Sequence, residues 1–390
     1  MKKVKSIAIA GSMAQKPGRG GHTWVFLQYL LGFRELGWDV LFLDRLEPEM
    51  CHDAAGTHNS IEHTWNMRYF RDVMHGFGFD GSYGLLSNGG EITFGLTRRQ
   101  ILDRVASSEA LINVIGFFDD EEILANAPTR VFLDIDPGFG QMWQASGLHD
   151  MFHGHDAYVT IAENIGQAEC TVPTCNLPWI TTRQPVVTNE WPVFSDSCTA
   201  ERPITSIASW RGAYDPVVYQ GTTYGLRVHE FRKFASLPGL AADRFELALD
   251  IHEGDAKDIE RLSREGWSLI DPRRVAGDPW RYRDYIRCSA AELMIAKGMY
   301  VQTRSGWFSD RSICYLASGR PVLAQDTGLS GFLPTDAGLL TFATLDEAVE
   351  MTRAIRRDYA RHARAARNVA EECFNSSVVL ASLTRKLGLC

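Results

Sequence analysis

The sequence has no apolar run long enough to cross a membrane, because no window approaches the about 18 apolar residues of a transmembrane helix. Near the N-terminus, the apolar stretch from Ile7 to Ala10 is also shorter than the about 7–15 residues of a signal-peptide core. We therefore expect a cytoplasmic protein without stable membrane insertion.

A basic composition is missing too. Lys and Arg together number 40 and are outnumbered by 48 Asp and Glu, which gives a formal net charge of −8. This balance argues against a nucleic-acid partner, since such binding depends on neutralising phosphates.

Metal-binding and disulfide motifs are absent as well. The eight cysteines include no Cys-x-x-Cys pair, so we expect reduced thiols. The spacing of His149, His153 and His155 matches no zinc motif, and the short Asp134-x-Asp136 pattern does not by itself demand a divalent cation. We expect no metal and no cofactor.

A dinucleotide-binding fingerprint is also lacking, because the first loop, Gly18-Arg-Gly-Gly, does not have Gly-x-Gly-x-x-Gly spacing. This argues against a dehydrogenase. What the sequence does have is the composition of a globular protein, 45% hydrophobic and 23% charged, and 390 residues, enough for about two domains.

The first half of the chain predicts a parallel α/β sheet. Apolar residues at helical spacing from Trp24 to Leu36 lie between two short buried runs, which is a β-α-β unit. The aromatic-rich stretch 47–91 predicts a helix and a long loop that shapes a substrate pocket. The strands expected in this half are Ser6–Ala10, Asp39–Asp44, Ala110–Ile115, Thr129–Leu133 and Ala157–Ala162.

A second α/β series follows a proline-bearing connection. We predict an N-terminal domain (1–190), a linker (191–203), a second domain (204–365) and a helical C-terminal segment (366–390). The second domain is expected to have strands at Ile204–Trp210, Phe245–Ile251, Trp267–Ile270, Met299–Gln302 and Pro321–Ala324. Its expected helices are Tyr224–Leu237, Ser289–Lys297 and Ser309–Ser318, and the chain from Leu345 to Leu387 is expected to be helical.

Two such halves place a crevice at the carboxyl ends of both sheets, where ligands bind at helix N-termini. The loop Gly20-Gly21-His22 opens directly into the first helix. Its glycines would let the backbone approach an anion or carbonyl. A tight turn with a surface histidine explains the same residues.

The stretch from Arg304 to Gly328 carries the second group of candidates. Small residues before a helix leave N–H donors that suit a diphosphate, and arginines would add charge-assisted hydrogen bonds. An ordinary capped αβ unit is the alternative. The candidates for binding such a diphosphate are Arg304, Ser305, Gly306, Ser309, Asp310, Arg311, Asp326, Thr327 and Gly328.

Three further residues complete the candidate site. Arg211 follows the first strand of the second half, where a guanidinium would bind an anion, and Lys297 is a weaker candidate for the same task. Asp136 follows a strand of the first half and would bind an acceptor hydroxyl or orient His22. A surface arginine and a helix-capping aspartate are the competing interpretations.

The sequence resembles the GT-B glycosyltransferases. The resemblance rests on Gly20-Gly21-His22, on Gly37-Trp38-Asp39-Val40, and on Gly319-Arg320-Pro321-Val322. It implies two Rossmann-like domains facing across a cleft, with the C-terminal helix packing back on the first. It also implies a UDP, dTDP or GDP sugar donor, a small-molecule, lipid or glycan acceptor, and a nucleobase read near Trp267 to Trp280. In such a fold Arg211, and less strongly Lys297, would stabilise the departing nucleoside diphosphate.

One departure bears on mechanism. Many retaining members of this group carry two glutamates eight positions apart, and the matching positions here hold Gly306 and Cys314. Their absence favours inversion, with His22 as the base and without a metal. A nucleotide-sugar epimerase or hydrolase, and a non-catalytic protein that binds the nucleotide sugar, remain as alternatives.

Overall fold

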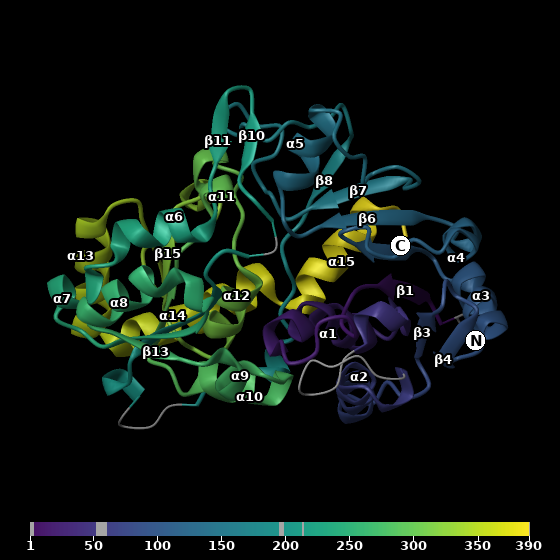
Figure 1. Ribbon diagram of the computed structural model, residues 1–390, viewed down its shortest axis with the longest axis horizontal. Helices are drawn as coiled ribbons and strands as arrows, with labels where there is room; N and C mark the ends of the chain where they lie inside the picture. The colour runs from purple at the N-terminus through teal and green to yellow at the C-terminus, as the bar shows by residue number, and fades with distance from the viewer. Residues whose placement is uncertain (1–3, 52–60, 195–198, 213, 390) are drawn as a thin grey trace.

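The computed structural model describes residues 4–51, 61–194, 199–212 and 214–389. Two α/β domains lie beside each other, with the C-terminal helix α15 reaching from one to the other (Figure 1). Cys198, Cys390 and part of the predicted linker lie outside the described residues.

The first domain is built on an eight-stranded sheet of order β4-β3-β2-β1-β5-β6-β7-β8. All neighbouring strands are parallel except β3 and β4. The strands are β1 (Ser6–Ala10), β2 (Asp39–Arg45), β3 (Tyr83–Ser87), β4 (Ile92–Gly95), β5 (Leu111–Val114), β6 (Arg130–Asp134), β7 (Ala157–Thr160) and β8 (Trp179–Thr181). The helices of this domain are α1 (Gly20–Glu35), α2 (Trp65–Gly76), α3 (Arg98–Ser107), α4 (Glu121–Asn126) and α5 (Phe139–Ala145).

The second domain has a six-stranded parallel sheet of order β13-β12-β9-β14-β15-β16. Its strands are β9 (Ile204–Ser209), β12 (Phe245–Asp250), β13 (Trp267–Ile270), β14 (Ala291–Met294), β15 (Val322–Gln325) and β16 (Leu339–Phe342). A separate hairpin comprises β10 (Val217–Tyr219) and β11 (Thr222–Tyr224).

The helices of the second half of the chain alternate with these strands and continue to the C-terminus. They are α6 (Arg227–Phe231), α7 (Leu237–Ala241), α8 (Ala256–Arg264), α9 (Pro272–Ala276), α10 (Pro279–Arg287), α11 (Gly298–Thr303), α12 (Asp310–Ala317), α13 (Leu345–Arg357), α14 (Tyr359–Val369) and α15 (Ser376–Lys386). The predicted helical C-terminal stretch is therefore confirmed.

Two predictions around residue 295 were wrong. The segment expected as a helix, Ser289–Lys297, contains strand β14, and the expected strand Met299–Gln302 is helix α11. Ala, Glu, Leu and Met are strong helix formers, but here they form an inner strand between β9 and β15 that is buried on both faces. Tertiary burial overrides the local preference.

Other boundaries also differ. The expected helix Tyr224–Leu237 starts later, at Arg227, because the chain first forms the β10–β11 hairpin. The stretch 47–91 contains helix α2 as expected but also the strand β3, which was not predicted.

The C-terminal helix packs back on the first domain, as the resemblance implied. A Cβ on Gly32 of α1 would lie 2.7 Å from Leu380 Cδ1, so glycine lets α1 and α15 approach closely. Lys386 Nζ also donates to the carbonyl of Thr181 at 2.7 Å. The molecule has the two-domain α/β architecture expected from the sequence. The two sheets fall within the two predicted ranges, while the domain boundaries remain predictions.

Candidate functional site

A cavity of about 800 Å³ lies between the two domains. The first domain contributes Trp65 and the loop 17–22. The second contributes the carboxyl ends of β9, β12 and β13, together with the start of α9. Ligands bind at this end of parallel strands in open α/β sheets.

The N-terminus of α1 faces this cavity through Gly20, Gly21 and His22. Arg19, the N-cap residue, makes no side-chain cap, and the first N–H bonded within the helix is that of Thr23, to Arg19 O at 3.1 Å. The N–H groups that precede it lack intrahelical acceptors, as at any helix start. With the helix dipole, they form a site that favours an anion.

The two glycines of this loop also have a packing role that the sequence did not indicate. A Cβ on Gly20 would lie 2.2 Å from Asp278 O, and one on Gly21 would lie 2.8 Å from Tyr282 Cε2. Neither glycine has a positive φ. They are needed because the start of α1 packs against the backbone and side chains at α10.

His22 lies half-buried at the wall of the cavity. Its Nε2 is 3.1 Å from the carbonyl oxygen of Ser12 and 3.2 Å from the hydroxyl oxygen of the same residue. Burial, followed by the charge of Lys16, lowers the pKa of His22 to about 3. The imidazole is therefore neutral near pH 7.

Arg227, at the start of α6, is the cation of the second domain that lines the cavity without a carboxylate partner among the described residues. Its Nε donates to Ile295 O at 3.1 Å and its Nη1 to Ser209 O at 3.3 Å. Burial, followed by the charge of Arg311, lowers the pKa of Arg227 to about 10. The guanidinium stays charged and is available to an anion.

Asp310 and Arg311, at the start of α12, also line the cavity. Arg311 is buried and forms an ion pair with Glu292 of β14, while its Nη1 donates to Ile207 O at 2.9 Å. Ser309 caps α12 by accepting from Arg311 N at 3.2 Å. Burial raises the pKa of Asp310. Arg311 therefore already holds α12 against the sheet.

Arg211 does not line the cavity. It pairs with Asp255, and its side chain is 54% exposed. The hairpin that separates it from Arg227 could not be recognised in the sequence. Sequence reasoning missed Arg227 for this reason, and a lone arginine at a helix start carries no motif that would have identified it.

The other predicted donor residues of the second domain gather around Asn164 of the first, outside the cavity lining. Asn164 Nδ2 donates to the carbonyls of Arg304 and Gly328 at 3.0 and 3.2 Å, and Asn164 N donates to Ser305 O at 3.1 Å. Gly306 N is bonded to Thr327 O at 2.8 Å, and Asp326 accepts from Gly328 N at 2.9 Å. These hydrogen bonds hold the two domains together. They also occupy most of the N–H groups that were expected to bind a diphosphate.

Asp136 and Lys297 meet across the domain interface. Lys297 Nζ lies 2.8 Å from both carboxylate oxygens of Asp136. Neighbouring Asp134 accepts from Gln141 Nε2 and Thr160 Oγ1 at 2.7 and 2.9 Å, and burial raises its pKa to about 6. The Asp-x-Asp pair thus supports local and interdomain structure.

Apart from Asp250, Asp271 and Arg273, the remaining wall of the cavity is mostly apolar. Side chains from the ends of β12 and β13 and from α8 and α9 form it, including Leu249, Ile251, Ile259, Leu269, Ile270 and Ala276. The stretch expected to read a nucleobase contributes several of them. An apolar slot beside cations and free amides suits a flat base joined to a phosphate group.

Within the described residues, no group of three or more His, Cys, Asp or Glu is placed to hold a metal ion. The six described cysteines are unpaired. No described helix has the length and apolar character needed to cross a membrane.

Three solved structures show what this chain is similar to. Sucrose-phosphate synthase from Thermosynechococcus elongatus is 13% identical, with 98% of this chain and 99% of the synthase covered, at a TM-score of 0.52. An α-glucosyltransferase in complex with UDP and a 13-mer DNA is 11% identical, with both chains covered completely, at a TM-score of 0.60. Anabaena HepE in complex with UDP and glucose is 10% identical, with 99% and 100% covered, at a TM-score of 0.53.

These likenesses extend over both domains, so the chain has the GT-B fold. No protein-family model matches it, and no curated protein matches its sequence.

Proposed function

We propose that this protein is a glycosyltransferase that moves a sugar from a nucleoside-diphosphate sugar to an acceptor hydroxyl. The observation that carries the proposal is the interdomain cavity, in which the free amides of α1 and the unpaired Arg227 lie beside an apolar slot. Similar folds that were solved in complex with UDP support a nucleotide as the ligand.

The proposed reaction is direct displacement at the anomeric carbon, with inversion and without a metal. The acceptor oxygen forms the new bond to that carbon while the bond to the diphosphate oxygen breaks. Arg227 and the amides at Gly20 and Gly21 take up the charge of the departing diphosphate. The acceptor proton passes to the imidazole of His22, which is neutral and can therefore accept it.

The diphosphate would also make His22 a better base. After burial and the charge of Lys16, the charge of Arg19 also lowers the pKa of His22. Because Arg19 lines the cavity, a diphosphate that neutralises it raises that pKa toward its ordinary range. Cys314, at one of the positions where retaining relatives carry glutamate, is buried and contributes no carboxylate.

The test is thermal stabilisation by UDP, dTDP, GDP and ADP in the presence of EDTA. A nucleotide at a hundredfold excess over its dissociation constant adds about 2.7 kcal/mol of stability. Arg227→Met should lower the affinity for the nucleotide that stabilises the wild type at least tenfold. Arg211→Met is the matched control, because Arg211 is paired outside the cavity, and it should bind like the wild type.

Stabilisation by no nucleoside diphosphate would contradict the proposal. An equal loss in both variants would contradict the assignment of Arg227. Release of free sugar at the full rate without any acceptor would instead identify a hydrolase.

A further inference from the structure

The second place of interest lies in the first domain, at the carboxyl ends of β1 and β5. Strand β1 pairs with β2 on one side and with β5 on the other. The strands that follow β1 are therefore added first on one side of it and, from β5 onward, on the other side. In open α/β sheets the crevice at such a switch point is where ligands bind. The loops after β1 and β5 border it, and they present Lys16 and Phe117.

Lys16 is half-buried, and its ammonium has no ion pair or hydrogen bond with any residue that the structure describes. Burial, followed by the charge of Arg19, lowers the pKa of Lys16. The two carboxylates near it are occupied. Asp44 accepts from the backbone N–H groups of Ala14 and Arg45, both at 2.7 Å, and Asp136 is bound to Lys297.

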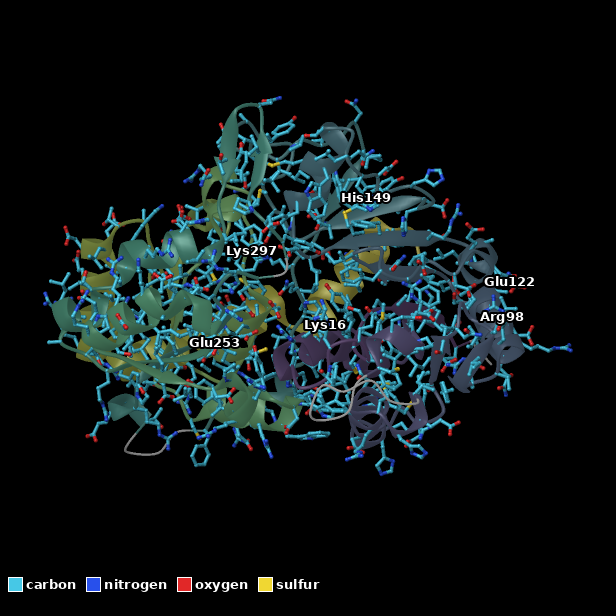
Figure 2. All side chains as sticks on the ribbon, in the orientation of Figure 1. Lys16, Arg98, Glu122, His149, Glu253 and Lys297 are labelled. Atoms are coloured by element: carbon cyan, nitrogen blue, oxygen red, sulfur yellow. The ribbon has the colours of Figure 1, made fainter. Side chains whose placement is uncertain are left out.

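A partly buried ammonium without a counter-charge is costly, and a bound anion removes that cost. Figure 2 shows Lys16 and Lys297 in the region where the two domains meet. Lys297 has its own carboxylate partner, whereas Lys16 has none in the described parts of the chain.

Both loops are held rigidly. Asp44 binds the amide of Ala14, and Asn66 Nδ2 donates to the carbonyl of the same residue at 2.9 Å. On the other side, the buried Asn113 exchanges hydrogen bonds with the backbone of Phe118 at 2.8 and 3.2 Å. A site built on such loops is organised before its ligand arrives.

The loop after β5 also carries backbone strain. Ile115 has a φ of +57°, a left-handed conformation that is unfavourable for a β-branched residue, and Gly116 follows with +66°. This pair of left-handed residues turns the chain so that Phe117 stays 36% exposed, with its ring centroid 5.3 Å from Lys16 Nζ. Strain of this kind gathers at ligand sites.

Neither Lys16 nor Phe117 lines the cavity assigned to the donor. We propose that the two residues form the acceptor subsite and that the acceptor is a small hydroxyl compound carrying an anionic group, such as a sugar phosphate. Lys16 binds the anion, and the exposed face of Phe117 packs against the apolar face of the acceptor ring. This assignment rests on the proposed transferase function.

The experiment saturates the protein with UDP, so that the donor cavity is filled, and then titrates inorganic phosphate, glucose 6-phosphate and glucose. The readout is thermal stability beyond that given by UDP alone. Phosphate and glucose 6-phosphate should stabilise the wild type, and glucose should not. Lys16→Met should lower the affinity for both anions at least tenfold and change the affinity for UDP by no more than about twofold.

Two variants serve as controls. Lys257→Met removes one exposed lysine of α8 and should behave as the wild type. Phe117→Ala should lower the affinity for glucose 6-phosphate several-fold more than the affinity for inorganic phosphate, because only the sugar ring contacts the aromatic face.

The outcomes separate the two proposals. Loss of UDP binding in Lys16→Met would show that Lys16 holds the diphosphate of the donor, which overturns the acceptor subsite but keeps the transferase. No stabilisation by phosphate or glucose 6-phosphate, or equal stabilisation by glucose, would also overturn it. Tighter binding of a DNA duplex than of glucose 6-phosphate would replace the small acceptor by a nucleic acid. Failure of all four nucleoside diphosphates to stabilise the wild type would contradict the proposed function.

Discussion

Lys297 Nζ lies 2.8 Å from each carboxylate oxygen of Asp136, and this ion pair joins the loop after β6 in the first domain to the start of α11 in the second. The ammonium also lies over the rings of Phe139, Tyr214 and Tyr300, at 4.8, 5.8 and 5.4 Å from their centroids. Side chains of both domains therefore surround a single lysine.

We expect this pair to hold the two domains together. Lys297→Met leaves the Asp136 carboxylate without its partner and should lower the free energy of unfolding by about 2–4 kcal/mol. The double variant with Asp136→Asn should be less destabilised than the sum of the single variants, by about 1–3 kcal/mol. Chemical denaturation measures both, and additive single effects would contradict a coupled pair.

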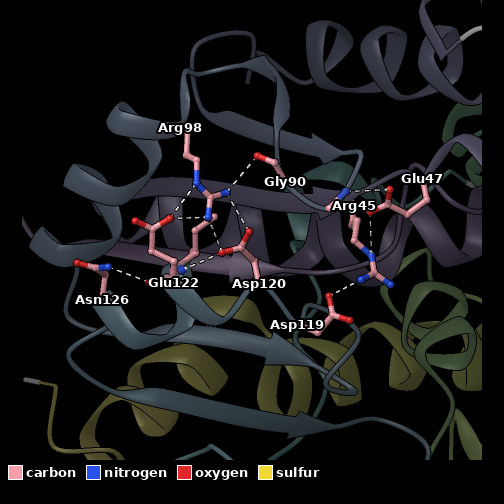
Figure 3. Close-up of polar contacts among 10 residues, drawn as sticks. Arg45, Glu47, Gly90, Arg98, Asp119, Asp120, Glu122 and Asn126 are labelled. Atoms are coloured by element: carbon pink, nitrogen blue, oxygen red, sulfur yellow. Dashed lines mark hydrogen bonds and ion pairs between the residues drawn. The ribbon is translucent and has the colours of Figure 1, made fainter.

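Arg98 should stabilise the edge of the first domain without affecting ligands. Figure 3 shows its guanidinium between Asp120 and Glu122, and it donates to Asp120 at 2.9 and 3.0 Å and to Glu122 at 2.6 Å. Arg98→Met should cost about 1–2 kcal/mol because these charge-assisted bonds tie α3 to α4.

The neighbouring Arg99 is the matched control for that variant. The Arg99 side chain is 92% exposed, and its Nε lies 3.9 Å from Asp103 Oδ2, which is a long distance for an ion pair. Arg99→Met should therefore change the free energy of unfolding by less than about 0.5 kcal/mol. Both variants should keep the wild-type response to UDP. A reduced response in Arg98→Met would show that the α3–α4 edge communicates with the cavity.

Gly20 should tolerate no side chain. The Cβ of Gly20→Ala would meet the carbonyl oxygen of Asp278 at 2.2 Å, so the start of α1 must move away from α10. We expect a loss of about 1–3 kcal/mol in stability and weaker nucleotide binding. Gly239→Ala in α7 is the control, because nothing lies within 4 Å of its Cβ, and its stability should be unchanged or higher. Equal effects in the two variants would contradict the packing role.

The pH dependence of stability should report on His22. The pKa of His22 is about 3 in the folded protein, and its ordinary value, which applies to the unfolded chain, is 6.5. Between pH 3 and pH 6.5 the unfolded chain therefore binds more protons than the folded protein. Stability contributed by neutral His22 is therefore present above pH 6.5 and is lost as the pH falls, by up to about 1.4 kcal/mol per unit. Unfolding measured from pH 4 to 7 should show a steeper fall for the wild type than for His22→Gln. Parallel curves would contradict the buried, neutral imidazole.

Much of the fold could be predicted because alternating short apolar runs and helical spacing are local properties. The strand Ser6–Ala10 and the strand Trp267–Ile270 were predicted with the bounds that the structure has. The error at Ser289–Lys297 arose because residues with helical preference lie in an inner strand, where burial on both faces decides the conformation. Of the candidate site, the sequence indicated the loop at Gly20 to His22 and the start of α12, and both line the cavity.

By itself, the sequence determined two successive α/β halves and a glycine-rich loop that opens a helix, since both follow from residue order within one segment. Only the tertiary structure decided which arginine faces the cavity, because Arg211 and Arg227 are separated by a hairpin that turns one outward and the other inward. It likewise decided that Lys297 is neutralised by Asp136 while Lys16 is left without a carboxylate partner among the described residues. The residues that surround a charged side chain come from segments that are far apart in the sequence. A local sequence pattern does not show which of these segments come into contact.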